Sequence, residues 1–394
     1  MPTALTRPAS IAEVQAAVRA ASPGSRILTR GRGTKPPLST PPEGAVALDV
    51  SGLSGIVEYE PGEFTFTALA GTPIAEIDAA LAEHGQFLPF DPPLVEAGAT
   101  LGGTVAAGLS GPGRYRYGGV RDFILGVRYV DGAGEVVRTG GKVVKNAAGF
   151  DISKLMVGSL GALGVLVELS FKVFPKPEAY ATLRVFHPTL DDALATLHRL
   201  TGSPMEFFAI DLAPTPDGVI VEVRLGGLTT ALPERLARLR GLMGGGEALV
   251  DDADAAHWRV AREFAWLPEG AALVKVPVTP GRIAKLEADL TEFATKITAK
   301  NAEGAEKMKS SAISASSAVR ISSPRRYSAG GQVAWIACAP AALDGLDAAL
   351  KTQDLSGLVV LGQPGRTRLG VRTGQSFERR VKAALDPEAR FVEV

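Results

Sequence analysis

Hydrophobic and polar residues in the amino-terminal part of the chain repeat with periods that predict short helices and strands in alternation. After Ser10, valine and alanine recur at helical spacing, and Ser10 together with Glu13 has the pattern of a capping box. Residues 64–68 alternate with a period of two, which predicts a strand. A second helix is predicted with Pro73 at its first position and its end at Gly85. This pattern indicates a mixed α and β domain.

A hairpin and a long strand follow later in the same part of the chain. Residues 123–130 and 135–139 are strand-like and flank the turn sequence Asp-Gly-Ala-Gly, which is typical of a hairpin. A short helix is predicted over residues 151–157, and a long strand over residues 164–174. These elements would complete the sheet of the first domain.

A pair of prolines, Pro175 and Pro177, marks the predicted domain boundary. We therefore expect a first domain of residues 1–177 and a second domain of residues 178–394. The second domain is predicted from strands at 182–186, 219–225, 272–278 and 333–337 and from helices at 190–200 and 377–385. This mixture indicates a smaller α+β, cap-like domain.

The segment 300–327 interrupts this pattern. It is rich in serine, alanine and lysine and has no clear amphipathic face, so we expect a flexible surface loop. An alternative is a basic docking segment, because Arg320, Arg325 and Arg326 lie near its end.

Composition narrows the classes of function. Lys+Arg and Asp+Glu balance at 42 each, which gives no indication of a nucleic-acid partner. The single cysteine, Cys338, excludes an intrachain disulfide and an iron–sulfur cluster ligated by cysteines of this chain. No run reaches the roughly 18 apolar residues of a membrane span, and the first residues lack the apolar core of a signal peptide. We therefore expect no direct membrane span and a cytoplasmic location.

Glycines gather in short repeated patterns between residues 97 and 164. Glycine lets backbone amides approach a ligand closely, and several such turns at one place present N–H donors to a large anionic cofactor. The run 30–34, Arg-Gly-Arg-Gly-Thr, follows a predicted strand and suits the same purpose. Neither the G-x-G-x-x-G nor the G-x-x-x-x-G-K-[ST] pattern is present, so a different kind of phosphate site is expected.

The run 129–175, which includes VKNAAGFDISKLMVGSLGALGV, resembles the FAD-binding domain of the vanillyl-alcohol oxidase (PCMH-type) superfamily. Residues 30–34 and 100–106 stand in the order that this family uses. A narrower resemblance, through residues 120–126 and 155–159, is to the E-subunit family of bacterial glycolate oxidase complexes.

The resemblance implies a PCMH-type fold of two α/β subdomains that binds FAD. The residues it assigns to the cofactor are Gly31, Arg32, Gly33, Thr34, Thr100, Gly102, Gly103, Thr104, Gly108, Gly161, Gly164 and Val165. None of the four histidines lies in a glycine-rich turn, so we expect noncovalent FAD rather than a histidyl–flavin link. No metal ligand and no catalytic residue is assigned.

The resemblance also implies a function: support of the oxidation of glycolate, a 2-hydroxy acid, within a complex. Its partners would be a larger FAD-binding subunit and an iron–sulfur subunit, and any membrane attachment would come through them. Two departures keep alternatives open. Residues 388–394 replace the usual asparagine-proline-glycine ending, and residues 358–375 lack the histidine motifs of catalytic relatives. The alternatives are a free-standing D-2-hydroxy acid dehydrogenase, D-lactate-like, and a non-catalytic assembly subunit.

Overall fold

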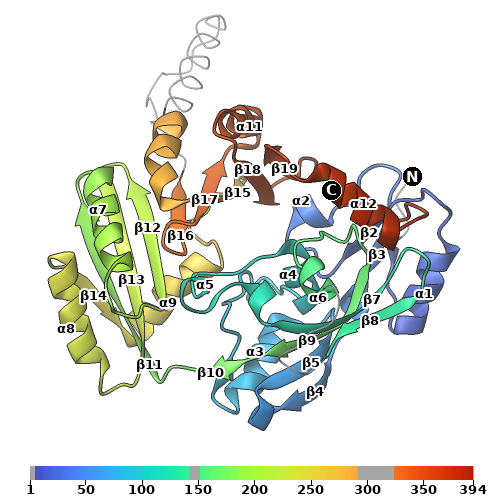
Figure 1. The fold of residues 1–394 in the computed structure, drawn as a ribbon, viewed down its shortest axis with the longest axis horizontal. Helices are drawn as coiled ribbons and strands as arrows, with labels where there is room; N and C mark the ends of the chain where they lie inside the picture. Colours follow the sequence, from blue (N-terminus) through green and yellow to red (C-terminus); the bar gives the residue numbers. More distant parts are fainter. Residues whose placement is uncertain (1–4, 142–150, 292–323, 394) are drawn as a thin grey trace, which may run out of the picture.

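The computed structural model describes residues 5–141, 151–291 and 324–393, which form four sheets (Figure 1). The first sheet is parallel and three-stranded, in the order β1 (Leu5–Thr6), β3 (Val46–Asp49) and β2 (Ile27–Arg30). Helix α1 (Ile11–Ala20) packs on it and buries Val14 and Val18. The predicted N-cap is confirmed at Ser10, since Ser10 Oγ accepts the Glu13 N–H at 3.2 Å. The Glu13 carboxylate accepts the Ala9 N–H at 2.9 Å, one residue before the N-cap, rather than the Ser10 N–H of a full capping box.

The second sheet is antiparallel and five-stranded. Its order is β4 (Ile56–Glu60), β5 (Thr65–Leu69), β9 (Val165–Lys172), β7 (Ile124–Val130) and β8 (Val136–Gly140). The predicted hairpin is confirmed as β7 and β8, and Asp131 Oδ1 accepts the N–H groups of Ala133 and Glu135 within its turn. Helix α3 (Ile74–Ala82) begins one residue later than predicted, because Pro73 is its N-cap.

The predicted strand over 164–174 is divided in the structure. After β9, the chain forms β10 (Phe174–Pro175), which pairs with β6 (Gln86–Phe87) in a separate two-stranded sheet. The predicted helix over 151–157 is the single turn α6 (Ile152–Leu155), capped by Asp151, whose side chain accepts the Lys154 N–H at 3.1 Å.

The third large element is an antiparallel sheet of nine strands (Figure 1). Its strands, in spatial order, are β14 (Glu247–Val250), β11 (Ala179–His187), β13 (Gly218–Gly227), β12 (Ala209–Thr215), β16 (Arg325–Ser328), β17 (Val333–Cys338), β15 (Ala272–Pro277), β18 (Ser356–Leu361) and β19 (Arg368–Gly370). It has more strands than the sequence predicted, since β12, β14, β16, β18 and β19 were not recognised.

Helices cover both faces of this sheet. Helices α7 (Leu190–Thr201), α8 (Leu232–Met243) and α11 (Leu343–Thr352) share one apolar core with the residues of β12 at positions 210 and 212. Helix α9 (Asp251–Arg262) packs on the other face, where Trp258 contacts a cluster that includes Ala209. Alternation of side chains along β12 explains this division. None of the helices within the described ranges is long and apolar enough to cross a membrane.

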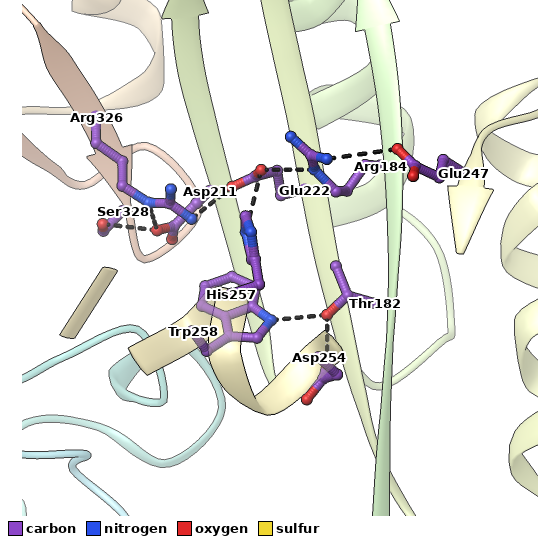
Figure 2. A network of polar contacts seen from close by, with 10 residues as sticks. All are labelled: Thr182, Arg184, Asp211, Glu222, Glu247, Asp254, His257, Trp258, Arg326 and Ser328. Atoms are coloured by element: carbon purple, nitrogen blue, oxygen red, sulfur yellow. Dashed lines mark hydrogen bonds and ion pairs between the residues drawn. The ribbon is translucent and has the colours of Figure 1, made fainter. Parts of the chain in front are cut away.

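A buried network of charges joins α9 to the sheet (Figure 2). Arg326 on β16 lies between two carboxylates of neighbouring strands, with its Nε 2.6 Å from Asp211 Oδ2 and its Nη2 paired with Glu222. Glu222 is also 3.0 Å from Arg184 Nε and 3.1 Å from His257 Nε2. Burial alone would raise the pKa of Glu222, but Arg326, His257 and Arg184 together lower it to about 2.

This network corrects one of the expectations for residues 300–327. Residues 300–323, with Arg320, lie outside the described residues. Arg325 and Arg326 lie in β16 and form ion pairs with Glu287, Asp211 and Glu222. Because both guanidinium groups are held inside the protein, the expectation of a loop or basic docking segment is wrong at these positions.

The carboxyl end returns to the amino-terminal sheets, and Figure 1 shows both ends of the chain on the same side. After α12 (Gln375–Leu385), Phe391 forms a parallel bridge with Ile27 of β2, and the Val392 N–H donates to Ile27 O at 3.0 Å. Lys382 Nζ on α12 donates to Ala162 O at 3.0 Å. The boundary predicted at Pro177 therefore divides the strands of the five-stranded sheet from those of the nine-stranded sheet. The last segment lies after this boundary in sequence but packs with the amino-terminal sheets.

Asp386 holds the returning segment in place, and its replacement should destabilise the protein. Asp386 is 2% exposed, and its carboxylate accepts the N–H groups of Arg390 at 2.8 Å and Phe391 at 3.0 Å, with Lys382 Nζ at 2.8 Å. Asp386→Ala leaves the N–H groups of Arg390 and Phe391 without these acceptors and removes the carboxylate partner of the buried Lys382 ammonium, so the free energy of unfolding should fall by about 2–4 kcal/mol in urea denaturation. Glu388→Ala, which removes an exposed partner of Arg390, should cost less than about 1 kcal/mol. Equal losses in the two variants would contradict this account.

Candidate functional site

A hollow of about 660 Å³, partly open to solvent, lies where three glycine-bearing segments meet. They are the loop after β2, the helix α4 (Leu101–Ala107) and the turn that precedes β9. The predicted site residues that line the hollow are Gly31, Arg32, Gly33, Thr34, Thr100, Gly102, Gly103, Gly161 and Gly164. Segments far apart in the sequence thus form one surface, as the glycine pattern predicted.

Three predicted residues do not line this hollow. Thr104 lies on the buried side of α4, and its Oγ1 has no hydrogen-bond partner within the described residues. Val165 on β9 is fully buried among the apolar residues that also hold α1. Gly108, the C-cap of α4, lines a second, neighbouring hollow. For these three, a direct contact with a cofactor stays a prediction.

Close packing explains the glycine at position 102, and backbone conformation explains the glycine at position 161. A Cβ atom at Gly102 would lie 2.8 Å from Ala70 Cβ and 2.9 Å from Ala70 O, so a side chain there would push α4 away from the end of β5. Gly161 has a φ of +79°, which residues with a side chain rarely adopt. The wall of the hollow is therefore built largely of backbone.

The loop after β2 presents backbone donors to the hollow. Thr100 caps α4 by accepting the Gly103 N–H at 3.2 Å, whereas the N–H groups of residues 32–34 meet no acceptor in the described part of the chain. Consecutive backbone N–H groups without acceptors make a concave site for anions. The loop therefore suits a phosphate.

A buried ammonium group adds positive charge beside this loop. Lys35 also lines the hollow, is 7% exposed, and donates from Nζ to Thr34 Oγ1 at 3.1 Å. Burial lowers the pKa of Lys35 to about 8, and no carboxylate of the described residues offsets this effect. A buried cation without a carboxylate partner is costly unless an anion binds beside it.

Two further polar side chains of β2 at the same wall have buried atoms without a hydrogen-bond partner among the described residues. Thr29 Oγ1 and Arg30 Nε are buried without a hydrogen-bond partner among the described residues, although Arg30 Nη2 lies 3.6 Å from Asp49. Together with Lys35 and the free amides, they fit a ligand that carries a diphosphate and other polar groups. Within the same residues, no group of three His, Cys, Asp or Glu side chains could hold a metal ion.

Comparison with known proteins shows what the chain is similar to. Residues 2–140 match the family described as the FAD binding domain. The loop after β2 and helix α4 lie inside the matched range of the FAD-binding domain, and the turn at Gly161 lies beyond it.

Three curated relatives resemble part of this chain. The chain is 49% identical over 166 residues to glycolate oxidase subunit GlcE of Escherichia coli, which covers 42% of this chain and 47% of that protein. It is 31% identical to glycolate oxidase subunit GlcD of Bacillus subtilis, covering 50% and 42%, and 31% identical to D-lactate dehydrogenase of Anaerostipes hadrus, covering 42% and 35%. The chain thus matches less than half the length of each relative.

The fold as a whole has a solved counterpart. A structure of alkyldihydroxyacetonephosphate synthase superposes with a TM-score of 0.71 at 16% sequence identity, covering 98% of this chain and 74% of that one. At this identity the likeness establishes the fold alone. It shows that the amino-terminal sheets and the nine-stranded sheet together form a known architecture, in agreement with the predicted α+β fold of two domains.

The second hollow adjoins the first, and both have Ala107 and Leu160 in their walls. It encloses about 1140 Å³, part of it open solvent, between the amino-terminal domain and strands β15 and β18. Lys275 on β15 bridges the two sides, since its Nζ donates to Gly108 O at 2.9 Å. The first hollow therefore has a neighbouring chamber.

Lys35 and Lys275 are the candidate residues that sequence reasoning missed. Lys35 had a usable signal, because it directly follows the Gly31–Thr34 run and precedes the prolines that open α2 (Pro36–Ser39). Lys275 had none, because its contact with Gly108 spans 167 positions of sequence. Within its own strand, it reads as one polar residue among apolar neighbours.

Proposed function

We propose that this chain is the FAD-binding subunit of a glycolate oxidase complex and binds FAD noncovalently in the hollow lined by Gly31–Thr34, Thr100–Gly103 and Gly161. The convergence of free amides and the buried Lys35 at one wall carries the proposal. When bound, FAD supplies an acceptor for the hydride equivalent of a 2-hydroxy acid. The chain itself binds and orients the cofactor and excludes water from it.

The choice of glycolate rests on the 49% identity to glycolate oxidase subunit GlcE over 166 residues. The proposed partners are a larger FAD-binding subunit and an iron–sulfur subunit, which pass the electrons onward. The single cysteine supports a need for such partners, because this sequence does not provide the thiolates of a cluster. We place the complex in the cytoplasm, with any membrane contact made by the partners.

A free-standing D-2-hydroxy acid dehydrogenase is the second candidate. Similarity to the D-lactate dehydrogenase of Anaerostipes hadrus favours it, and so does the chamber beside the cofactor hollow. An assembly subunit without a redox role would keep the fold yet need no FAD.

Flavin measurements on the purified chain distinguish these three functions. We expect flavin absorbance to survive gel filtration and to leave the protein on denaturation, which would also establish noncovalent binding. For the subunit, anaerobic glycolate or D-lactate should leave the flavin of the isolated chain oxidised, and activity should require the partners. Bleaching by either acid alone would favour the free-standing dehydrogenase. A folded, flavin-free chain that still restores activity to the complex would favour the assembly subunit.

A further inference from the structure

The end of helix α9 contacts the loop that leads into α4. Helix α9 lies on the side of the nine-stranded sheet that faces the amino-terminal domain (Figure 1). The carboxylate of Glu263, the C-cap of α9, accepts two consecutive backbone N–H groups, that of Val95 at 3.0 Å and that of Glu96 at 3.2 Å. One residue earlier, Arg262 O accepts the Leu94 N–H at 3.3 Å. Two residues of the second domain therefore bind three successive amides of the first.

The Glu263 carboxylate is the charged part of this contact. Its side chain is 10% exposed, and its Oε1 also lies 3.5 Å from Arg262 Nε. A charged acceptor binds a backbone N–H more strongly than a neutral one does. Within the described residues, the N–H groups of Val95 and Glu96 have no other acceptor. Their hydrogen bonds therefore depend on the second domain.

The loop that is held in this way has a backbone conformation that needs support. Leu94 has a φ of +63° and Asp91 has a φ of +52°, in the left-handed region that residues with a side chain rarely adopt. Such a conformation persists where the surrounding structure holds it in place. Helix α9 contributes to this, through the bond from Leu94 to Arg262 O and through Arg262 Nη1, 3.9 Å from Asp91 Oδ1.

The same loop leads directly to the wall of the cofactor hollow. Leu94 O accepts the Ala99 N–H at 3.0 Å, and the next residue, Thr100, caps α4 and lines the hollow. The loop also packs on the glycine-bearing loop after β2, since a Cβ atom at Gly98 would lie 3.6 Å from Arg32 Cδ. A shift of residues 94–96 would therefore move the groups that face the hollow.

We infer that Glu263 is a positioning residue for FAD, through which the second domain fixes the wall of the cofactor hollow. The inference rests on the proposed function, because it takes this hollow as the FAD site. Glu263 does not line the hollow itself, so it acts through residues 94–100. Such coupling is reciprocal. Loss of the contact weakens FAD binding, and bound FAD in turn stabilises the contact between α9 and the loop.

Fluorescence titration of the apoprotein with FAD tests this role. Glu263→Ala should raise the dissociation constant for FAD about threefold to thirtyfold, as loss of a coupled contact outside a site typically does. Glu263→Gln keeps one acceptor oxygen for the two donors, so its dissociation constant should lie between those of Glu263→Ala and the unaltered chain. Glu269→Ala is the matched control, since it removes an exposed carboxylate six residues further on, and it should leave the affinity unchanged.

Hydrogen exchange separates a positioning role from a purely structural one. Without FAD, peptides that cover residues 94–97 should exchange faster in Glu263→Ala than in the unaltered chain, because two amides have lost their acceptor. Saturating FAD should slow the exchange of these peptides in both proteins, since binding and the contact are coupled. A purely structural glutamate would change the free energy of unfolding but not the affinity for FAD.

Three results would overturn the positioning role. They are an unchanged FAD affinity in Glu263→Ala, an equal loss of affinity in Glu269→Ala, and exchange at residues 94–97 that does not respond to FAD. Should Glu263→Ala fail to fold, Glu263→Gln decides in the same way. An unaltered chain that binds no FAD would overturn the proposed function and the positioning role together. FAD binding that is insensitive to Glu263 would overturn the positioning role alone.

Discussion

Replacing Gly103 with valine should abolish most FAD binding while the chain stays folded. Gly103 lies on α4 at the wall of the cofactor hollow, and a Cβ atom there would have one neighbour within 4 Å, Thr100 Oγ1 at 2.9 Å. The larger side chain therefore enters the hollow rather than the protein core. We expect the dissociation constant for FAD to rise about tenfold to a hundredfold or more, as overpacking typically costs. Fluorescence titration of the apoprotein measures it.

The stability of the same variant should change little. Loss of the Thr100 cap costs about 1 kcal/mol, and removal of a helical glycine returns about 0.5–1 kcal/mol. Gly241→Val is the matched control, since Gly241 is an exposed glycine of α8 whose Cβ position has no neighbour within 4 Å. It should bind FAD as the unaltered chain does. Normal FAD affinity in Gly103→Val would show that the cofactor lies elsewhere.

Lys35→Met should weaken FAD binding and stabilise the apoprotein, two effects that a purely structural lysine would not combine. Loss of a charge-assisted hydrogen bond to a diphosphate should raise the FAD dissociation constant about tenfold to a hundredfold. Riboflavin, which lacks the diphosphate, should bind both proteins equally. An equal loss of affinity for riboflavin and FAD would contradict the assignment of Lys35 to the phosphate end.

The gain in apoprotein stability follows from the lowered pKa. Lys35 has a pKa of about 8 when folded, against 10.5 for the ordinary group. At pH 7 this difference costs the folded apoprotein on the order of 3 kcal/mol, which the methionine variant avoids. Between these two values the unfolded chain binds more protons, so the stability of the unaltered apoprotein should rise with pH. Urea denaturation at pH 7 and pH 10 tests this, and the variant should lack this part of the rise.

FAD affinity should depend on pH with the opposite sign. A bound diphosphate favours the ammonium form of Lys35, so the affinity of the unaltered chain should fall as the pH rises above about 8. Lys35→Met should show a flatter profile, because it has no proton to lose at this position.

Local patterns predicted a large part of the first domain. The helix N-cap at Ser10, the hairpin around Asp131 and the glycine runs are each complete within a few residues, so their structure follows from backbone geometry and short hydrogen bonds. The second domain was less predictable. Strand β16 follows a serine-rich stretch, and it is held by ion pairs of Arg326 to β12 and β13, more than a hundred positions away.

The sequence by itself determined which segments bend sharply and expose amides, because glycine and proline act on the chain at their own positions. Only the tertiary structure decided that three of these bends line one hollow and that Lys35 is buried at its wall. It likewise decided that Lys275 of β15 donates to Gly108 at the end of α4 and that Phe391 returns to β2. Burial and charge proximity depend on neighbours distant in the chain, and these set the electrostatics of both hollows.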